Sequence, residues 1–275
     1  MDFHLDADDP FVAGEGDAEH AYLDGAREAW VKEELYMDWL HQRSPVRQLK
    51  LRERDLYLHH WDPWLHDGAR VLDVGCGIGR FALPLLDRGA TVHGVDADLA
   101  SLRRLAWRAV GRPGSLDLHW SGVHVLPEVE VDLVVACEVL CYAPDLERAL
   151  AGAVARLRPG GVLLLALEGR WGWACAPDVP AGALGQALVG DGELDLPGDR
   201  YVRTLEGPEV EALVADAGLE LELLTPTHYV LDGPLEAVAG DVPPLDVLLD
   251  VEEACRVHPV WAPLNRIWTV AARRP

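Results

Sequence analysis

The stretch VLDVGCGIGRF, residues 71–81, joins an apolar strand pattern to a glycine-rich turn and the start of a helix. Glycine tolerates positive φ and lets another molecule approach the backbone closely. At the end of a parallel strand, such a turn presents the free N–H groups of the next helix to an anion or a nucleotide. Gly75, Gly77 and Gly79 are spaced G-x-G-x-G, whereas dinucleotide-binding folds favour G-x-G-x-x-G, and Arg80 stands where the last glycine of that pattern would be.

Strand and helix patterns alternate from residue 70 onward. Near-continuous apolar strands separated by helices indicate a parallel sheet covered on both faces, connected by right-handed crossovers. The predicted fold is therefore α/β, with a Rossmann-like, doubly wound sheet. The predicted strands are 71–75, 91–96, 116–120, 131–137, 161–168, 219–225 and 265–274, and the predicted helices are 80–88, 99–110, 146–157 and 207–217.

The segment before the first predicted strand has a different pattern. Helical periodicity covers residues 18–42 and 46–60, and four of the ten tryptophans lie before residue 65. We expect an N-terminal helical cap or lid over 1–67, followed by a main domain over 68–275. The main domain has an insertion at about 232–262, which is helical around 244–257. The aromatic residues of the cap either pack on the main domain or cover a substrate, and the sequence leaves both readings open.

Composition and charge exclude several classes of protein. The formal net charge of −22 repels phosphate backbones and anionic lipid, so we expect neither nucleic acid nor a membrane as partner. No uninterrupted apolar run approaches 18 residues, and the first ten residues do not resemble a signal peptide. The five cysteines are scattered without a C-x-x-C pair, which argues against disulfides and structural zinc. These features predict a cytoplasmic protein.

Two aspartates strengthen the nucleotide interpretation. Asp73 lies inside the first strand, two residues before Gly75, and Asp96 ends the next strand. A carboxylate at the end of that strand can accept hydrogen bonds from both ribose hydroxyls. The alternative role for Asp96, capping the next helix, suits Asp98 better.

With these motifs in place, the sequence resembles the class I S-adenosylmethionine-dependent methyltransferases. The resemblance covers roughly residues 50–230 and the last strand, and it implies a seven-stranded sheet whose last strand is antiparallel. The matching stretches are VLDVGCGIGRFALPLLDRGATVHGVDAD (71–98), VDLVVACEVLCYAPD (131–145), LRPGGVLLLALEG (157–169) and RYVRTLEGPEVEALVADAGLELE (200–222).

The resemblance also implies a role for individual residues in holding S-adenosylmethionine. The glycine loop, formed by Gly75, Cys76, Gly77 and Gly79, would hold the methionine part of the cofactor. Asp96 would bind the ribose, and Ala97 would lie beside the adenine. Family members often carry an acidic residue after the third strand. Here Ser121 and Gly122 stand there, so an adenine contact would come from the backbone. The implied cofactor-binding residues are Asp73, Gly75, Cys76, Gly77, Gly79, Asp96, Ala97, Ser121, Gly122, Cys137 and Glu138.

The implied reaction is methyl transfer from the sulfonium of the cofactor to a small molecule, with S-adenosylhomocysteine as product. The accepting atom, oxygen, nitrogen or carbon, stays open. Aromatic residues in the segments that can cover the site favour a flat or apolar acceptor. Tyr142 and His228 are the candidates for a catalytic side chain. We expect no metal.

Three alternatives remain at this stage. A protein of the same fold can catalyse another reaction on the same cofactor. It can also bind the cofactor without catalysis. A nicotinamide-dependent oxidoreductase is disfavoured by the glycine spacing.

Overall fold

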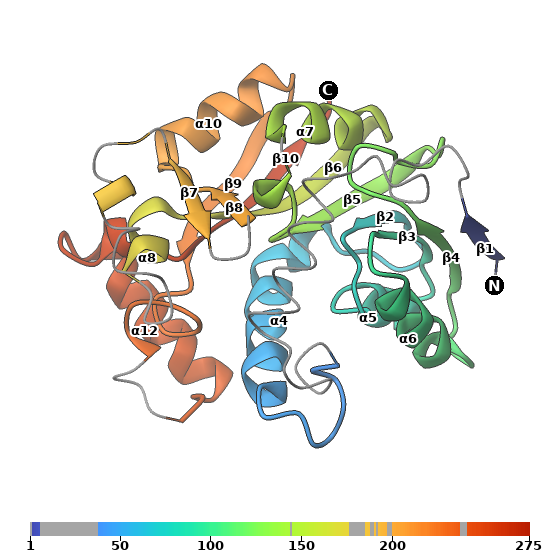
Figure 1. Ribbon diagram of the computed structural model, residues 1–275, viewed down its shortest axis with the longest axis horizontal. Coiled ribbons are helices and arrows are strands. Elements are labelled where there is room, and N and C mark those ends of the chain that lie inside the picture. The colour runs from blue at the N-terminus through green and yellow to red at the C-terminus, as the bar shows by residue number, and fades with distance from the viewer. Residues whose placement is uncertain are drawn as a thin grey trace.

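The molecule is built on one mixed sheet in the order β1-β4-β3-β2-β5-β6-β10-β9 (Figure 1). The computed structural model describes residues 2–5, 38–143, 145–175, 185–187, 190, 192–196, 200–236 and 241–275. Seven of the sheet's eight strands, all except β1, correspond to the predicted strands. The last of them, β10, is antiparallel to both of its neighbours, so the predicted fold is confirmed. The strands are β1 (Asp2–Leu5), β2 (Arg70–Val74), β3 (Thr91–Asp96), β4 (Ser115–Trp120), β5 (Val131–Cys137), β6 (Leu157–Glu168), β9 (Glu220–Thr227) and β10 (Ile267–Arg273).

Helices cover both faces of this sheet because successive strand residues point to opposite sides. In β2, Val71 packs with the helices of one face, whereas Leu72 and Val74 pack with those of the other. The first face carries α4 (Arg47–Trp61), α5 (Ala82–Asp87) and α6 (Leu99–Ala109), and the second carries α7 (Leu146–Ala155) and α10 (Gly207–Asp216).

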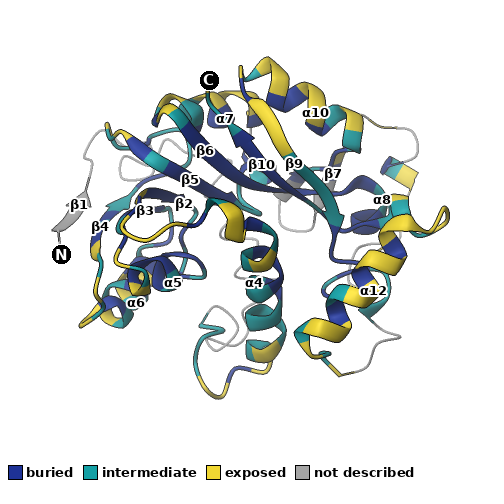
Figure 2. Ribbon diagram, turned by 180° about the vertical axis from the view of Figure 1, so that it is seen from behind, coloured by how far each residue is buried: buried dark blue, intermediate teal, exposed yellow. Residues whose placement is uncertain are grey.

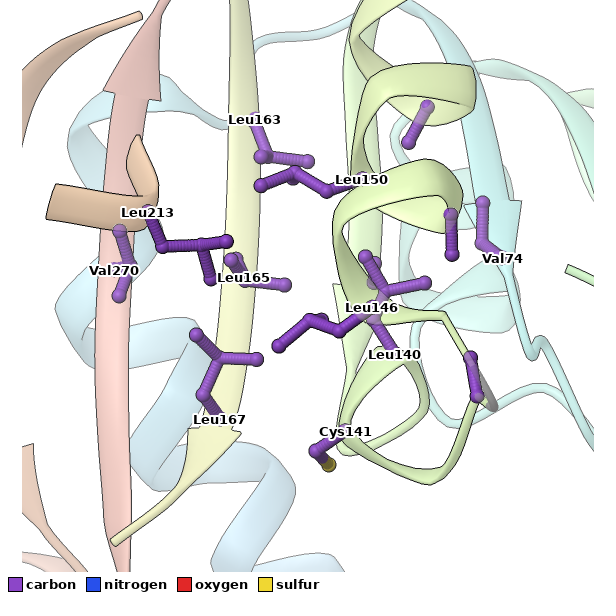
Figure 3. Close-up of a cluster of buried hydrophobic side chains, with 14 of the residues drawn as sticks. Val74, Leu140, Cys141, Leu146, Leu150, Leu163, Leu165, Leu167, Leu213 and Val270 are labelled. Carbon is purple, nitrogen blue, oxygen red and sulfur yellow. The ribbon is translucent and has the colours of Figure 1, made fainter. Parts of the chain in front are cut away.

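On the second face, packing against α7 explains the apolar residues of β6. Leu163, Leu165 and Leu167 alternate along β6 and meet Leu146 and Leu150 of α7 (Figure 3). All of these side chains are buried, and the sheet between the two helix layers is buried along most of its length (Figure 2). The long apolar stretch of β6 thus reflects a strand covered on both faces.

The helix starts follow from local side-chain chemistry. The Asp98 side chain accepts hydrogen bonds from the backbone N–H groups of Ala100 and Ser101, which confirms it as the N-cap of α6. At α10, Glu206 and Glu209 form a reciprocal capping box. Both helices begin within one residue of the sequence prediction.

Two elements lie between β6 and α10, where the sequence analysis predicts neither helix nor strand. They are the short helix α8 (Arg170–Ala174) and the strand β7 (Glu193–Leu196). This strand forms an antiparallel hairpin with β8 (Arg200–Arg203). Leu194 and Val202 of that hairpin are fully buried and stabilise it. The sequence pattern did not indicate the hairpin because glycines and prolines surround these two residues.

The N-terminal part shows one predicted helix clearly. Helix α4 matches the predicted helix 46–60, whereas residues 18–37 of the other predicted helix lie outside the described residues and residues 38–42 form turns. Tyr57 and Trp61 of α4 are fully buried, and the Trp61 indole donates to the carbonyl of Val270 at 3.1 Å. Part of the predicted cap therefore packs on the sheet, while a domain boundary at residue 67 stays a prediction.

A strand and an inserted helix complete the fold. β1 pairs in parallel with β4 at the sheet edge, a strand that the sequence did not indicate. Helix α12 (Leu245–Val257) confirms the helical part of the predicted insertion, and its Leu248 packs against Leu56 of α4. No helix within the described ranges has the length and apolar character needed to cross a membrane.

Candidate cofactor site

A pocket opens at the carboxyl ends of β2, β3 and β5. The chain leaves β2 toward β3 on one side and returns to β5 on the other, so this is the point where strand order reverses. Predicted site residues from four separate loops meet here. The pocket is lined by Gly75, Val95, Asp96, Ala97, Ser121, Gly122, Val123, Cys137, Glu138, Val139, Tyr142 and Ala143.

The glycine loop forms the part of the pocket nearest β5. Gly75 has a φ of 69°, and a Cβ there would lie 2.6 Å from Cγ2 of Val139, so no larger residue fits without movement. The backbone N–H groups of Gly75 and Cys76 both donate to the carbonyl of Val95, at 2.8 and 3.0 Å. The loop is thereby fixed to the end of β3 and pressed against the segment after β5.

Asp96 is held in place by the backbone on both of its oxygens. Gly77 N–H donates to Oδ2 and Asp98 N–H donates to Oδ1, each at 2.7 Å. Burial raises the pKa of Asp96 to about 6, and these two hydrogen bonds oppose that rise. Each carboxylate oxygen keeps a further lone pair, so the side chain can accept hydrogen bonds from two neighbouring hydroxyls of a ligand.

Four predicted binding residues are not part of the pocket wall. Gly77 and Gly79 shape the loop, with φ of 50° and 103°. Asp73 and Cys76 are buried beneath it, and burial raises the pKa of the Cys76 thiol well above its ordinary value. A neutral, buried thiol supports the role of Cys76 as a small packing residue in a tight turn.

Asp73 should make the stability of the cofactor-free protein depend on pH. The side chain is 2% exposed, and burial raises its pKa to about 8 in the folded state, although a hydrogen bond from the Ala82 backbone opposes the rise. The folded protein therefore keeps a proton that the unfolded chain releases. The free energy of unfolding should fall on the order of 1–2 kcal/mol as pH rises from about 6.5 to about 8.

Urea denaturation at both pH values measures this slope. The matched variant is Asp73→Asn, which keeps the shape of the side chain and cannot titrate. It should lose most of the slope, with a remainder from Glu252, whose pKa burial raises to about 7. An identical slope in both proteins would show that Asp73 does not hold the proton.

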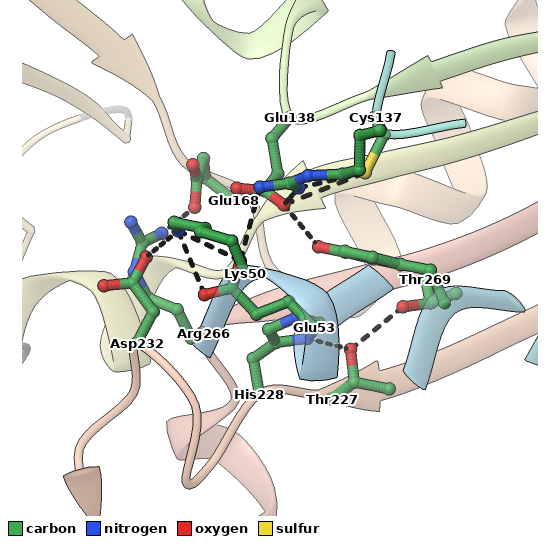
Figure 4. A network of polar contacts seen from close by, with 12 residues as sticks. Lys50, Glu53, Cys137, Glu138, Glu168, Thr227, His228, Asp232, Arg266 and Thr269 are labelled. Carbon is green, nitrogen blue, oxygen red and sulfur yellow. Dashed lines mark hydrogen bonds and ion pairs between the residues drawn. The ribbon is translucent and has the colours of Figure 1, made fainter. Parts of the chain in front are cut away.

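Glu138 is the second carboxylate of the pocket beside Asp96, and side chains behind the pocket wall fix it in place (Figure 4). The Tyr57 hydroxyl donates to Oε1 of Glu138 at 2.8 Å, and Arg80 Nη1 donates to the same atom at 2.6 Å. Arg80 Nη2 also donates to Oε2 of Glu53 at 3.3 Å, and Lys50 Nζ donates to Oε1 of Glu53 at 3.0 Å. We call Lys50, Glu53, Tyr57, Arg80 and Glu138 the polar cluster.

The polar cluster keeps Glu138 negatively charged. Burial alone would raise the pKa of Glu138, but Arg80, Lys50 and the Tyr57 hydrogen bond hold it below its ordinary value. Sequence reasoning found Glu138 and missed its supports. Arg80 carried a signal, since it replaces a glycine of the dinucleotide pattern, whereas Lys50, Glu53 and Tyr57 lie on a helix without any motif.

The two candidate catalytic residues are placed differently. Tyr142 lines the pocket, and its hydroxyl donates to Glu168, which is paired with Arg266. His228 does not line the pocket. It is 1% exposed, its Nδ1 lies 2.9 Å from the Thr227 hydroxyl, and its ring packs on Tyr57 at 4.7 Å between centroids. Burial lowers the pKa of His228 to about 4, so its imidazole is neutral at pH 7.

The described residues contain no group of three or more His, Cys, Asp or Glu side chains placed to hold a metal ion.

Comparison with known proteins identifies the family. Residues 72–163 match the family model of a methyltransferase domain. The ubiquinone biosynthesis O-methyltransferase of Brucella anthropi is 27% identical over 191 residues, which cover 66% of this chain and 73% of that protein. The matched part of the chain, residues 72–163, belongs to the class I S-adenosylmethionine-dependent methyltransferases. The ubiquinone biosynthesis O-methyltransferase of Paramagnetospirillum magneticum is 34% identical over 157 residues, covering 54% of this chain and 62% of that one.

The fold agrees with this family. The magnesium protoporphyrin IX methyltransferase of Synechocystis, solved with bound S-adenosylhomocysteine, superposes with a TM-score of 0.56 at 13% identity over 92% of this chain and 99% of that chain. The matches to the family model and to the curated relatives show an S-adenosylmethionine-dependent methyltransferase of small molecules. Membership of the family decides against the nicotinamide oxidoreductase alternative, and it favours methyl transfer over a different reaction or none.

Proposed function

We propose that the pocket at the ends of β2, β3 and β5 holds S-adenosylmethionine and that the methyl group passes to a hydroxyl oxygen of a small, flat or apolar molecule. The observation that carries the cofactor part is the position of Asp96. Its carboxylate lines the pocket, and two backbone N–H groups hold it with lone pairs still available. Pocket residues from the ends of β2, β3, β4 and β5 surround it, as an extended nucleoside ligand requires.

The lining residues fit the parts of this cofactor. Asp96 would accept hydrogen bonds from the ribose hydroxyls. Ala97, Ser121 and Gly122 would flank the adenine, which leaves backbone groups for its polar edge. The Glu138 carboxylate would lie near the amino group and the positively charged sulfonium. Bound here, the cofactor supplies an electrophilic methyl group, and the protein aligns donor and acceptor in a confined site.

The acceptor part rests on the relatives and on Tyr142. The curated relatives described above act in ubiquinone biosynthesis as O-methyltransferases. Tyr142 is the hydroxyl-bearing ring of the pocket, and its proton is directed toward Glu168. In this arrangement the Tyr142 hydroxyl would hydrogen-bond to an acceptor hydroxyl and orient it. Val139 and Ala143 beside it provide apolar contact for a flat ring.

Methyl transfer with paired acceptors tests this proposal. Purified protein is incubated with isotopically labelled S-adenosylmethionine and either a hydroxylated aromatic compound or the amine of the same skeleton. Mass spectrometry then measures S-adenosylhomocysteine and the methylated product. We expect O-methylation of the phenol and none of the amine. In a parallel calorimetric titration, Asp96→Ala should weaken cofactor binding about tenfold or more, because ribose hydroxyls lose their acceptor.

The control variant is Asp117→Asn, which changes a half-exposed carboxylate on neighbouring β4 that pairs with His93. It should bind S-adenosylmethionine like the original protein. Unchanged affinity in Asp96→Ala would remove the ribose role from Asp96. Methylation of the amine rather than the phenol would contradict the choice of oxygen and leave the cofactor assignment standing.

A further inference from the structure

Glu138 is supported from outside the pocket by two residues that are distant in sequence. Tyr57 lies on α4, 81 residues before Glu138, and Arg80 follows the glycine loop, 58 residues before it. Both donate to the same oxygen, Oε1. Neither belongs to the pocket wall, so their effect on a ligand must pass through Glu138. Glu138 itself has a φ of 54°, an uncommon conformation for a residue other than glycine.

The charges around Glu138 do not cancel. Arg80 pairs with Glu53 and Glu138, and Lys50 pairs with Glu53 at 3.0 Å and Asp232 at 3.8 Å. Among the described residues, this group contains three carboxylates and two cations, and the Asp96 carboxylate of the same pocket adds a further negative charge.

Three further titratable side chains close to Glu138 are neutral at pH 7. Burial lowers the pKa of His228 to about 4 and raises the pKa values of Tyr57 and Cys137 well above their ordinary values. Nearby, Glu168 and Arg266 form a pair without net charge. Because a partly buried excess charge is costly, the site gains most from a ligand that carries a positive charge.

We propose that Tyr57 and Arg80 are positioning residues that fix the Glu138 carboxylate, and that this carboxylate makes the pocket prefer positively charged S-adenosylmethionine over S-adenosylhomocysteine, whose sulfur is uncharged. The inference rests on the proposed cofactor pocket. It adds a consequence for turnover, since the loss of the positive charge during methyl transfer weakens the attraction of the pocket for the product.

Calorimetric titration of both ligands into the original protein, Tyr57→Phe and Glu138→Gln tests the inference. Tyr57→Phe keeps the ring that stacks on Trp61 and packs on His228, and removes only the hydroxyl. We expect its preference for S-adenosylmethionine to fall about tenfold, mainly through weaker binding of that ligand. Glu138→Gln should bind both ligands with similar affinity, and adding Tyr57→Phe to it should change nothing further.

The pH profile gives a readout that a general loss of packing would not move. Protonation of Glu138 should abolish the preference for S-adenosylmethionine at low pH, which gives the plot of affinity against pH an acidic limb. Loss of the Tyr57 hydrogen bond should move that limb to higher pH. Binding of S-adenosylhomocysteine should show only the effect of protonating Asp96, which lines the same pocket and acts on both ligands. The control is Tyr229→Phe, a fully buried tyrosine whose hydroxyl donates to the Ala262 carbonyl instead, and it should leave both the ratio and the profile unchanged.

The outcomes separate this inference from the proposed function. Equal affinity of the original protein for the two ligands would overturn the inference and leave the cofactor pocket intact. An unchanged ratio and pH limb in Tyr57→Phe would overturn the positioning role. Binding of neither ligand would overturn the proposed pocket itself, and the inference with it.

Discussion

Replacing Arg80 with methionine is expected to lower the free energy of unfolding by about 3–5 kcal/mol. The Arg80 guanidinium lies between two carboxylates, Glu53, which is 1% exposed, and Glu138. Methionine keeps the unbranched apolar stem of the side chain but leaves both carboxylates without this partner in a buried position. Urea denaturation of the cofactor-free protein at pH 7 measures the loss.

Two controls show whether the unpaired charges cause the loss. Adding Glu53→Gln and Glu138→Gln to the Arg80 variant removes those charges and should recover most of the stability. Arg54→Met removes an arginine of the same helix layer that pairs with its neighbour Asp55 near the surface, and it should cost less than about 1 kcal/mol. Equal losses for the Arg80 and Arg54 variants would contradict the central role of Arg80.

Gly75→Ala is expected to cost about 2–5 kcal/mol of unfolding free energy, as the sum of two effects. The residue has a φ of 69°, which strains any L side chain, and the new Cβ would lie 2.6 Å from Val139 Cγ2. The absence of a side chain at Gly75 therefore lets the glycine loop lie against Val139, which follows β5 and lines the same pocket. Denaturation without ligand measures the cost free of any effect on binding.

The same loop provides the matched control. Gly77 has a φ of 50°, and a Cβ there would meet no atom within 4 Å, so Gly77→Ala should show only the strain, about 1–2 kcal/mol. Adding Val139→Ala to Gly75→Ala makes room for the new methyl group and should restore part of the stability. If Gly75→Ala and Gly77→Ala cost the same, the clash with Val139 is not real.

Elements whose position depends on local sequence patterns could be predicted from the sequence alone. The predicted strands 91–96 and 131–137 agree with β3 and β5 at both ends, because each apolar run stops at a residue that enters the pocket. Gly75, Asp96 and Glu138 could be placed at one edge for the same reason, since parallel strands end together. Knowledge of the sheet type thus converts three separate motifs into one site.

The parts that could not be predicted depend on contacts between distant segments. Nothing near Tyr57 in the sequence shows that its hydroxyl meets Glu138, and the choice between His228 and Tyr142 depends on which way each side chain points. His228 is of the residue type most used for proton transfer, yet it packs behind Tyr57. The hairpin of β7 and β8 was missed because its two buried residues lie among glycines and prolines.

The bond between Trp61 and Val270 has a consequence for the order in which the protein is made. Helix α4 leaves the ribosome early, but its indole partner is 209 residues further along the chain. Contacts that close so long a loop form slowly and late in folding. The strands β2 to β6 can therefore assemble while the apolar side of α4 is still exposed. We therefore expect the hydrogen bond from Tyr57 to Glu138 to become fixed late, after β10 has been inserted between β6 and β9 and holds α4 on the sheet.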